Sequence, residues 1–514
     1  MRRRSSVSVS RFAPVVALIA LALTSISASA SPLAASAGPL RVSYLGPGQR
    51  LSGLATLGAS ASTRAARVVA VTFLLDGKPL GSDTTKPYRL KVDAGAFPPG
   101  AHHLRVAAVD SLGRRAESRP IPVTVVARYA RSLVASPNHG LKKALARLAR
   151  GNVAVRLLPG HYELSEVSLG SNTSLSGSGR STVISAPSGS YESILIGNGR
   201  HVLVSDLALD GSGPGPGDGQ AIEIRTGAAD VRISHVEIRH VRWRGVYAWG
   251  SYDDVSVQDS VINGDKQAEA GVVFEKGESS DSSVIRTRIS GFRSYGIDFS
   301  YLVHGDPSAA LDAVALDNVV TDITDPAVAD GRSECGIWSG GAKAALIGNV
   351  IKRTGWDGIE TVGSSQRVTI VANTVSATQT GIYLEHSTNS SLISGNRISN
   401  VDGGINVEWR YGGIGSSSNS FIGNTISAAD QGISVDVDND GNRIKHNVFL
   451  NVSFPVKLQG SSNNVVHGNR ACRTHSALVI EPTGLHEDGT PAIPEGNSLS
   501  DNLVRPCSRL EVQR

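Results

Sequence analysis

Glycines followed by aliphatic residues recur at regular intervals through the C-terminal three quarters of the chain. Eight such glycines are separated by 26, 25, 40, 22, 23, 23 and 28 residues, and asparagines in short turns repeat at intervals of 24, 23, 28, 23 and 22 residues. Such a period is typical of a β-solenoid, whose coils bury their apolar residues only by stacking on one another. The glycines are Gly245, Gly271, Gly296, Gly336, Gly358, Gly381, Gly404 and Gly432, and the asparagines are Asn349, Asn373, Asn396, Asn424, Asn447 and Asn469.

The residues after each glycine separate the interior of this solenoid from its outer face. Successive residues of a strand point to opposite sides, so we expect the first and third residues after the glycine inside and the second and fourth outside. The first residue is aliphatic in every repeat, as an interior position requires. These residues are Val246, Val272, Ile297, Ile337, Ile359, Ile382, Ile405 and Ile433.

The outward positions gather carboxylates and aromatic rings in the middle of the solenoid. The second position reads Glu223, Tyr247, Val273, Asp298, Trp338, Glu360, Tyr383, Asn406, Ser434 and Lys457. The fourth position reads Arg225, Trp249, Glu275, Ser300, Gly340, Val362, Glu385, Glu408, Asp436, Gln459 and Glu481. A mixture of acids and rings on one outer face is the kind of surface that binds or processes a polar polymer.

The first quarter of the chain has a different pattern. Between residues 38 and 127, short alternating strands such as VTFLLDGKPLG at 71–81 and IPVTVV at 121–126 are separated by turn residues, which predicts a β-sandwich. A short helix with Leu141, Leu145 and Leu148 on one face follows, and we expect residues 128–150 to form a linker and a capping helix. The solenoid is then expected to span residues 151–514.

Residues 1–30 have the form of a secretory signal peptide. Arg2, Arg3 and Arg4 precede an apolar run from Phe12 to Leu23, and Ala-Ser-Ala sequences at 28–30 and 35–37 offer two cleavage sites, the later one after residue 37. The apolar run is shorter than the roughly 20 residues of a membrane-spanning helix. We therefore expect a secreted or cell-surface protein with no membrane span after processing.

The charge and the cysteine content limit the possible binding partners and the cellular compartment of the protein. The formal net charge is +5, and removing the leader with its four arginines and no acid lowers it to +1. No Lys/Arg cluster interleaved with aromatic residues remains, so we expect no nucleic-acid partner. Cys472 and Cys507 both lie near the C-terminus, where we predict a disulfide bond, and Cys335 is expected to be a small buried residue rather than a nucleophile.

These patterns resemble two known families. The segment with DGKPLG at 76–81 and the closing IPVTVV strand resembles bacterial Ig-like modules. Residues 136–510, opening on VRLLPGHYELSEVSLGSNTSLSGSGRSTVI, resemble the pectate-lyase-like right-handed parallel β-helix superfamily. The resemblance implies an all-β protein, in which an N-terminal Ig-like β-sandwich precedes a right-handed parallel β-helix of about 12 coils. That superfamily includes lyases, hydrolases, epimerases and adhesins, so it does not fix the reaction.

Three acids are expected to stack on successive coils, namely Glu385, Glu408 and Asp436. Adjacent strands lie about 4.8 Å apart, and like charges directly opposite one another are destabilising. Raised pKa values, a bound cation, or pairing with His386 or Arg410 would relieve the repulsion. The alternative is that all three side chains are solvated and splayed apart.

Asp357 and Glu360, within Trp-Asp-Gly-Ile-Glu, complete the catalytic hypothesis. The backbones of Glu360 and Glu385 are expected roughly 8 Å apart, a span compatible with an acid and a base around one glycosidic bond. We expect Glu385 to be the acid, Glu360 or Asp357 the base, and His386 an orienting group, with Glu408 in the same cluster. In a β-elimination the acids would instead hold a cation.

Side chains around these acids are candidates for substrate binding. Exposed rings are unusual in water and suggest a platform for sugars, unless the long inserts at 301–313, 325–334 and 410–419 bury them. The candidate substrate-binding residues are Asp298, Trp338, Tyr383, Asn406, Trp409, Arg410 and Asp436.

Motifs of better-known reactions are missing. Neither Asp-Asp nor Gly-His-Gly of the polygalacturonase type occurs at the acids, and Arg443-Ile444-Lys445, which imitates the Arg-x-Lys of those enzymes, falls on the preceding strand. VDVDNDGN at 435–442 alternates oxygens as calcium loops do, but a β-turn explains it equally well. We expect no cofactor, with calcium as the alternative, and no metal site is predicted.

Two classes of function remain. The leading hypothesis is a secreted, monomeric enzyme that cleaves a glycosidic bond of a polysaccharide, as a glycoside hydrolase or a uronate lyase. The alternative is a non-catalytic polysaccharide-binding or cell-surface protein. An enzyme needs carboxylates that converge, whereas a binding protein needs only a flat strip of rings.

Overall fold

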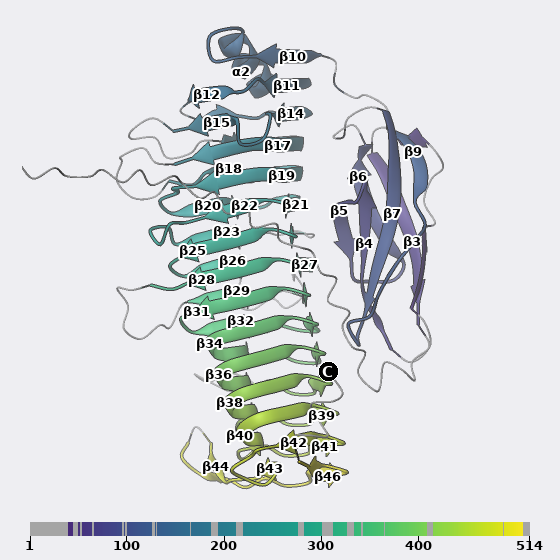
Figure 1. Cartoon of the computed structure of the whole chain (residues 1–514), viewed down its shortest axis with the longest axis vertical. Coiled ribbons are helices and arrows are strands. Elements are labelled where there is room, and N and C mark those ends of the chain that lie inside the picture. The colour runs from purple at the N-terminus through teal and green to yellow at the C-terminus, as the bar shows by residue number, and fades with distance from the viewer. Residues whose placement is uncertain are drawn as a thin grey trace, which may run out of the picture.

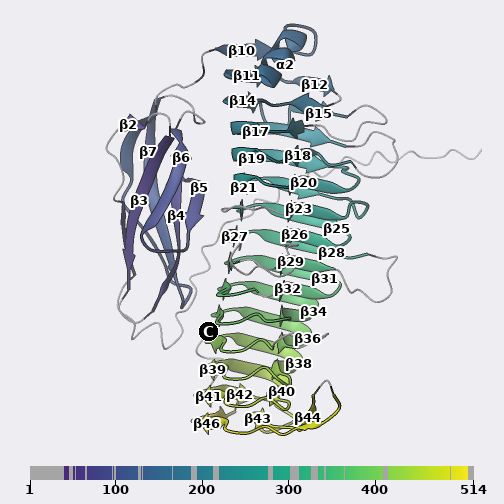
Figure 2. The same ribbon diagram turned by 180° about the vertical axis from the view of Figure 1, so that it is seen from behind.

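The computed structural model describes residues 40–506 apart from gaps at 45–49, 52–53, 64–65, 95–96, 98–99, 126–128, 130, 165, 187–193, 212–218, 276–281, 301–311, 326–333, 341–342, 364, 409–414 and 487. An N-terminal β-sandwich lies alongside a long β-solenoid, as the two opposite views in Figures 1 and 2 show. Within the described ranges, no helix has both the length and the apolar character needed to span a membrane.

The N-terminal unit is the predicted Ig-like sandwich. One sheet has the strand order β1-β3-β6 and the other β2-β9-β7-β4-β5, with β8 paired to β7. The two sheets enclose an apolar core around Phe73, Leu104 and Val106. The strands are β1 (Arg41–Tyr44), β2 (Arg50–Leu51), β3 (Leu54–Ser62), β4 (Val68–Leu75), β5 (Lys78–Asp83), β6 (Tyr88–Asp93), β7 (Gly100–Asp110), β8 (Arg115–Glu117) and β9 (Ile121–Val125).

An amphipathic helix, α2 (Leu141–Arg150), covers the N-terminal end of the solenoid (Figure 1). Ala144 and Leu148 are buried, and Leu141 and Leu145 pack against the same core. The helix therefore shields the apolar cross-section that the first coil would otherwise expose.

The rest of the chain is a parallel β-helix of about 12 turns, as the repeat predicts. Each turn passes through three parallel sheets, here called solenoid sheets 1, 2 and 3. Strands β17 and β19 run through sheets 1 and 2, whereas β34, β36, β38 and β40 run through sheets 2 and 3. Sheet 1 consists of β10 (Ser132–Ala135), β11 (Val153–Leu157), β14 (Thr173–Ser176), β17 (Arg200–Asp210), β19 (Ala229–Arg239), β21 (Asp253–Gln258), β24 (Ser282–Ile285), β27 (Asp312–Leu316), β30 (Lys343–Ile347), β33 (Thr369–Val371), β35 (Leu392–Ser394), β37 (Ser420–Ile422), β39 (Arg443–Lys445), β41 (Val465–His467) and β46 (Ser498–Ser500).

Sheets 2 and 3 complete each turn. Besides the shared strands, sheet 2 contains β12 (Gly160–Glu163), β15 (Thr182–Ser185), β22 (Val261–Asn263), β25 (Arg288–Phe292), β28 (Val319–Ile323), β31 (Val350–Thr354), β34 (Thr374–Leu384), β36 (Arg397–Val407), β38 (Thr425–Val435), β40 (Val448–Leu458), β42 (Arg470–Cys472) and β47 (Leu503–Val504). Sheet 3 adds β13 (Val167–Ser168), β16 (Ile194–Ile196), β18 (Ile222–Ile224), β20 (Arg244–Trp249), β23 (Ala270–Glu275), β26 (Tyr295–Ser300), β29 (Cys335–Gly340), β32 (Asp357–Val362) and β43 (Val479–Ile480). A small hairpin of β44 (Gly484–Leu485) and β45 (Pro491–Ala492) lies near the C-terminal end.

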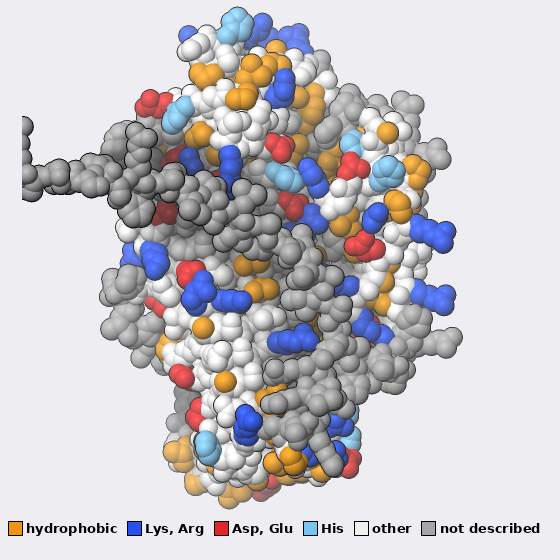
Figure 3. Space-filling view, viewed as in Figure 1, with side chains coloured by type: hydrophobic (Ala, Val, Ile, Leu, Met, Phe, Trp, Pro, Cys, Tyr) orange, Lys and Arg blue, Asp and Glu red, His pale blue; other side chains and the backbone are white. Residues whose placement is uncertain are grey.

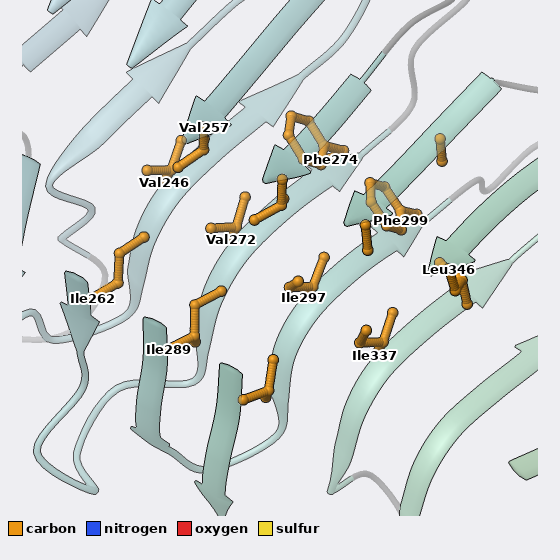
Figure 4. Packing of buried hydrophobic residues seen from close by; sticks show 14 of the residues in the cluster. Val246, Val257, Ile262, Val272, Phe274, Ile289, Ile297, Phe299, Ile337 and Leu346 are labelled. Carbon is orange, nitrogen blue, oxygen red and sulfur yellow. The ribbon is translucent and has the colours of Figure 1, made fainter. Parts of the chain in front are cut away.

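The interior is a continuous apolar column. Val246, Val272, Ile297 and Ile337 are register partners on successive strands of sheet 3, and all are fully buried, which confirms the inward assignment (Figure 4). The glycine before each of them is needed because the coils approach closely. A Cβ atom on Gly336 would lie 2.6 Å from the carbonyl oxygen of the next glycine in the column.

Buried asparagines stack where sheet 1 turns into sheet 2. The side-chain amide of Asn396 donates to Asn424 Oδ1 and to the Ile370 carbonyl, each at 2.9 Å, and its Oδ1 accepts from the Asn373 backbone N–H at 2.9 Å. This is the predicted ladder. A second ladder that we did not predict runs through Asn419, Asn442, Asn464 and Asn497.

The Ig-like sandwich packs on the outer face of solenoid sheet 1. Val69 and Val109 of the sandwich share an apolar cluster with Leu316 and Ile347 of the solenoid. Arg115 adds a bidentate ion pair, with its two terminal nitrogens 2.5 and 2.6 Å from the carboxylate oxygens of Asp317. The sandwich therefore occupies a different face from sheet 3.

Two of the three cysteines are described by the structure. Cys472 is disulfide-bonded, whereas Cys335 is free and buried, as expected. Cys507, the predicted partner of Cys472, lies outside the described residues.

Candidate functional site

Solenoid sheet 3 aligns the predicted outward residues coil by coil. Trp338 pairs in register with Glu360, Glu360 with Tyr383, and Tyr383 with Asn406. Asp298 precedes them as the register partner of Trp338. The predicted second-position column is therefore present in the structure.

The three stacked acids also lie on successive coils. The backbone N–H of Glu385 donates to the Thr361 carbonyl of the preceding coil. In the same way Glu408 donates to Leu384, and Asp436 donates to Val407. Sheet 3 therefore brings Glu385, Glu408 and Asp436 to the same end of adjacent strands.

This outer face is less exposed than strand alternation alone predicts. Only 4% of Tyr383 and 6% of Asp298 are accessible, although neither side chain belongs to the interior core. Tyr383 is therefore not the exposed sugar platform that we expected. Trp338 is partly exposed, and its ring lies over Gly340, where a Cβ atom would come within 2.4 Å of the ring.

The remaining substrate-binding candidates divide into two groups. Asn406 and Asp436 are partly exposed on sheet 3, although Asn406 Oδ1 itself is buried without a hydrogen-bond partner among the described residues. Trp409 and Arg410 lie outside the described residues, so the predicted pairing of the acids with Arg410 stays a prediction.

A thiol and two carboxyl groups converge beneath the face. Cys335 begins β29 and Asp357 begins β32, so they occupy equivalent places on adjacent coils. The Cys335 thiol donates to Glu360 Oε2 across 2.8 Å. Asp357 is completely buried, and within the described part of the chain neither of its carboxyl oxygens has a partner of good hydrogen-bond geometry, although Thr380 lies close enough to favour its charged form.

Burial shifts the pKa values of all three groups in the direction that disfavours charge. Burial, reinforced by the neighbouring Glu385 carboxylate, raises the pKa of Glu360 to about 7. The pKa of Asp357 is raised well above its ordinary value, first by burial and then by Glu360. Burial and the same two carboxyl groups also raise the pKa of the Cys335 thiol. The three groups therefore resist being ionised together.

Glu385 and Glu408 lie nearer the surface, and each has an orienting partner. His386 Nε2 lies 3.1 Å from Glu385 Oε1, and 15% of the Glu385 side chain is exposed. The Tyr383 hydroxyl donates to Glu408 Oε2 across 3.0 Å. We predicted several ways in which the repulsion between the stacked carboxylates could be reduced. One of them, pairing with His386, is present at Glu385.

This geometry changes the predicted catalytic roles. Asp357 has no exposed surface, so it cannot touch a substrate as a base. Glu360 accepts the Cys335 thiol, which turns the carboxyl toward the buried cluster. Among the predicted acids, Glu385 and Glu408 are therefore the pair best placed to reach a substrate.

The sequence analysis missed Cys335 as a member of the site. Strict alternation places the residue before each glycine inside, yet Cys335 and Asp357, which precede Gly336 and Gly358, both meet the outward Glu360. Comparing the residue before each glycine from coil to coil would have identified Cys335 and Asp357. The column of these preceding residues is mostly polar and reads Arg244, Ala270, Tyr295, Cys335, Asp357 and Thr380.

A second polar group on sheet 3 was also missed. The Arg244 guanidinium lies 3.9 Å from the Trp243 ring centroid and 4.2 Å from that of Tyr247. Arg244 also forms ion pairs with Glu269 at 3.2 Å and with Glu275 at 3.3 Å. Two coils beyond Arg244, burial raises the pKa of Asp298 to about 7. Charged groups thus extend along the sheet beyond the stacked acids.

One group of side chains has the spacing of metal ligands. Within the described residues, Cys335, Asp357 and Glu360 each place one donor atom within 4.8 Å of the others. The loop at 435–442 looks different, because its oxygens serve turn contacts: Asp438 lies 3.1 Å from His486 Nδ1, and Asp440 accepts the Ser462 backbone N–H.

Comparisons with known proteins give two matches to family models. Residues 307–474 match the model described as "Periplasmic copper-binding protein (NosD)", and residues 41–106 match a bacterial Ig domain. The first match covers the stacked acids and the Cys335 cluster. No curated protein matches the chain.

Several solved structures resemble the fold at low identity. The A-module of the mannuronan C-5 epimerase AlgE6 of Azotobacter vinelandii is 16% identical, with a TM-score of 0.40 over 72% of this chain and 94% of its own. The GH87 α-1,3-glucanase of Streptomyces thermodiastaticus is 15% identical, with a TM-score of 0.43 over 91% of this chain and 90% of its own. The alginate lyase of Paenibacillus sp. FPU-7 is 16% identical, with a TM-score of 0.42 over 55% of this chain and 98% of its own. The N-terminal sandwich thus matches a bacterial Ig domain, and part of the parallel β-helix, residues 307–474, matches the NosD model.

Proposed function

We propose that this is an extracytoplasmic protein that cleaves a glycosidic bond of a polysaccharide on the outer face of solenoid sheet 3. The observation that carries the proposal is the pair Glu385 and Glu408, two partly exposed carboxyl groups on adjacent coils with an orienting partner each. The Ig domain and the periplasmic description of the matched model support the location.

The spacing of the pair suggests its chemistry. Adjacent coils place the two backbones about 4.8 Å apart, close to the roughly 5 Å between the carboxyl groups of enzymes that retain anomeric configuration. Glu385, next to His386, would protonate the leaving oxygen. Glu408, fixed by the Tyr383 hydroxyl, would attack or stabilise the sugar carbon. For a uronate, His386 or Tyr383 would be the nearest group to remove a proton.

The test is a panel of neutral and acidic polysaccharides incubated with the purified protein. New reducing ends without absorbance of unsaturated uronates would establish hydrolysis, and both signals together would establish β-elimination. Glu385→Gln is expected to lower the rate by about 10²- to 10⁴-fold, as loss of a general acid does. Wild-type turnover by this variant would rule out the pair.

A second candidate function is favoured by the NosD match. That family model is described as a periplasmic copper-binding protein and not as an enzyme, which favours a non-catalytic role. If the chain only binds a polymer, the panel would show binding without any new ends, and Glu385→Gln would change affinity alone.

A further inference from the structure

Asp357 presents a problem that protonation does not solve. An ionised carboxylate with no exposure and no partner is strongly destabilising, and a protonated one needs an acceptor for its hydroxyl. Neither oxygen of Asp357 has a partner of good hydrogen-bond geometry within the described residues, although the neighbouring Thr380 favours its charged form. Neither form is therefore fully satisfied. A positively charged ligand between the donors would satisfy both oxygens.

The surroundings of Asp357 supply further donors but no compensating charge. Cys335 and Glu360 contribute a thiol sulfur and a carboxyl oxygen, and all three donor atoms lie within 4.8 Å of one another. No lysine, arginine or histidine of the described ranges forms an ion pair with Asp357 or Glu360. In a tetrahedral zinc site, where Zn–S is about 2.3 Å and Zn–O about 2.0–2.2 Å, the donors lie roughly 3.5 Å from one another, so a modest inward shift of the three side chains would bring them onto one ion.

We propose that Cys335, Asp357 and Glu360 form a binding site for a divalent transition-metal ion of the zinc type. The thiolate argues against calcium and magnesium, which take oxygen ligands. Two carboxylates argue against copper(I), which prefers soft sulfur ligands. Three protein ligands leave a fourth position for water or for a group of a bound molecule, since Glu360 reaches the partly exposed face.

The copper in the description of the matched NosD model does not suit this donor set well. The cluster contains one sulfur, no histidine and no methionine, whereas copper sites in proteins draw on those ligands. Zinc binding by this cluster does not depend on the proposed saccharide chemistry, so each can be tested without the other.

Zinc chloride titrated into the full mature chain, after removal of metals with a chelator, tests the proposal. Mass spectrometry of the metal content after gel filtration should give one zinc ion per chain, and excess zinc should raise the melting temperature. Asp357→Asn and Cys335→Ser should each weaken zinc binding at least tenfold. Cobalt chloride should produce thiolate-to-cobalt absorbance in wild type and not in Cys335→Ser.

Asp298→Asn is the matched control, because Asp298 is a buried carboxyl on the same sheet but outside the cluster. It should bind zinc as the wild type does. Without metal, Asp357→Asn should melt no lower than the wild type, which shows that it folds. The proposal is wrong if the wild type binds no zinc, if both cluster variants bind it with wild-type affinity, or if copper alone binds.

Discussion

Asp298 shows how the outer face of sheet 3 handles a carboxyl group that it buries. The Ser300 hydroxyl donates to it, and Arg244 favours its charge, but burial together with Glu275 and Glu269 leaves its pKa at about 7. In the unfolded chain this carboxyl group has the ordinary aspartate pKa of 3.8. Between those two values the folded state binds more protons, so the free energy of unfolding falls as pH rises and levels off above pH 7.

Asp298→Asn should remove this dependence. Between pH 5 and 8 the wild type should lose about 3 kcal/mol more stability than the variant, because each pKa unit corresponds to roughly 1.4 kcal/mol. Melting temperatures of both proteins at the two pH values would measure the difference. Parallel pH profiles would show that Asp298 is ionised in the folded protein at pH 5.

Ile382 and Tyr383 are neighbours on β34 with opposite orientations. Ile382 is fully buried in the solenoid core, so Ile382→Asp should place an unpaired charge there and unfold the coil stack. Tyr383 lies outside that core, so Tyr383→Phe should keep the fold and lose the hydrogen bond to Glu408. Thermal unfolding followed by circular dichroism would measure the stability of both variants. Equal destabilisation would contradict the assigned register.

At the scale of the element, the asparagine ladder holds neighbouring coils in register. Asn396→Ala would leave the Ile370 carbonyl and the Asn373 backbone N–H without their buried partner. We expect a loss of about 3 kcal/mol, since each unsatisfied buried group costs roughly 1–3 kcal/mol. Gln379→Ala, an exposed substitution nearby, should change stability by less than about 0.5 kcal/mol. Denaturant unfolding would show whether the two variants differ.

The strands were predictable because glycine spacing and the aliphatic column repeat in every coil. The same alternation predicted which side chains point away from the core. It did not predict that the outward side chains of Tyr383 and Asp298 would be almost inaccessible to solvent. Coverage depends on tertiary contacts that no local pattern encodes. Cys335 was missed because strict alternation places the residue before Gly336 inside the solenoid, whereas the Cys335 thiol contacts the outward Glu360.

At the scale of the whole molecule, the Ig-like sandwich and the solenoid share an apolar interface. Leu316 is buried in it, so Leu316→Asp should weaken the docking of the sandwich on sheet 1. Small-angle scattering should then show a larger maximum dimension. Asp317→Asn, which breaks only a partly exposed ion pair, should leave the dimension unchanged. Equal dimensions in both variants would mean that the apolar cluster does not hold the two units together.

Charged side chains of both signs are scattered over the face shown in Figure 3, and the formal net charge of the whole chain is only +5. The concentration of carboxyl groups on sheet 3 is therefore a local feature of the fold and not a consequence of net charge. It coincides with the part of the chain that matches the NosD model.

The central claim is that Glu385 and Glu408 perform chemistry on a bound saccharide. The most direct test is the rate of bond cleavage on the best polysaccharide of the panel for the wild type, Glu385→Gln, Glu408→Gln and the control Glu117→Gln, whose side chain lies in the Ig-like sandwich. We predict that both sheet 3 variants lose at least 100-fold in rate while the control equals the wild type. Cleavage at the wild-type rate by both sheet 3 variants would contradict the account.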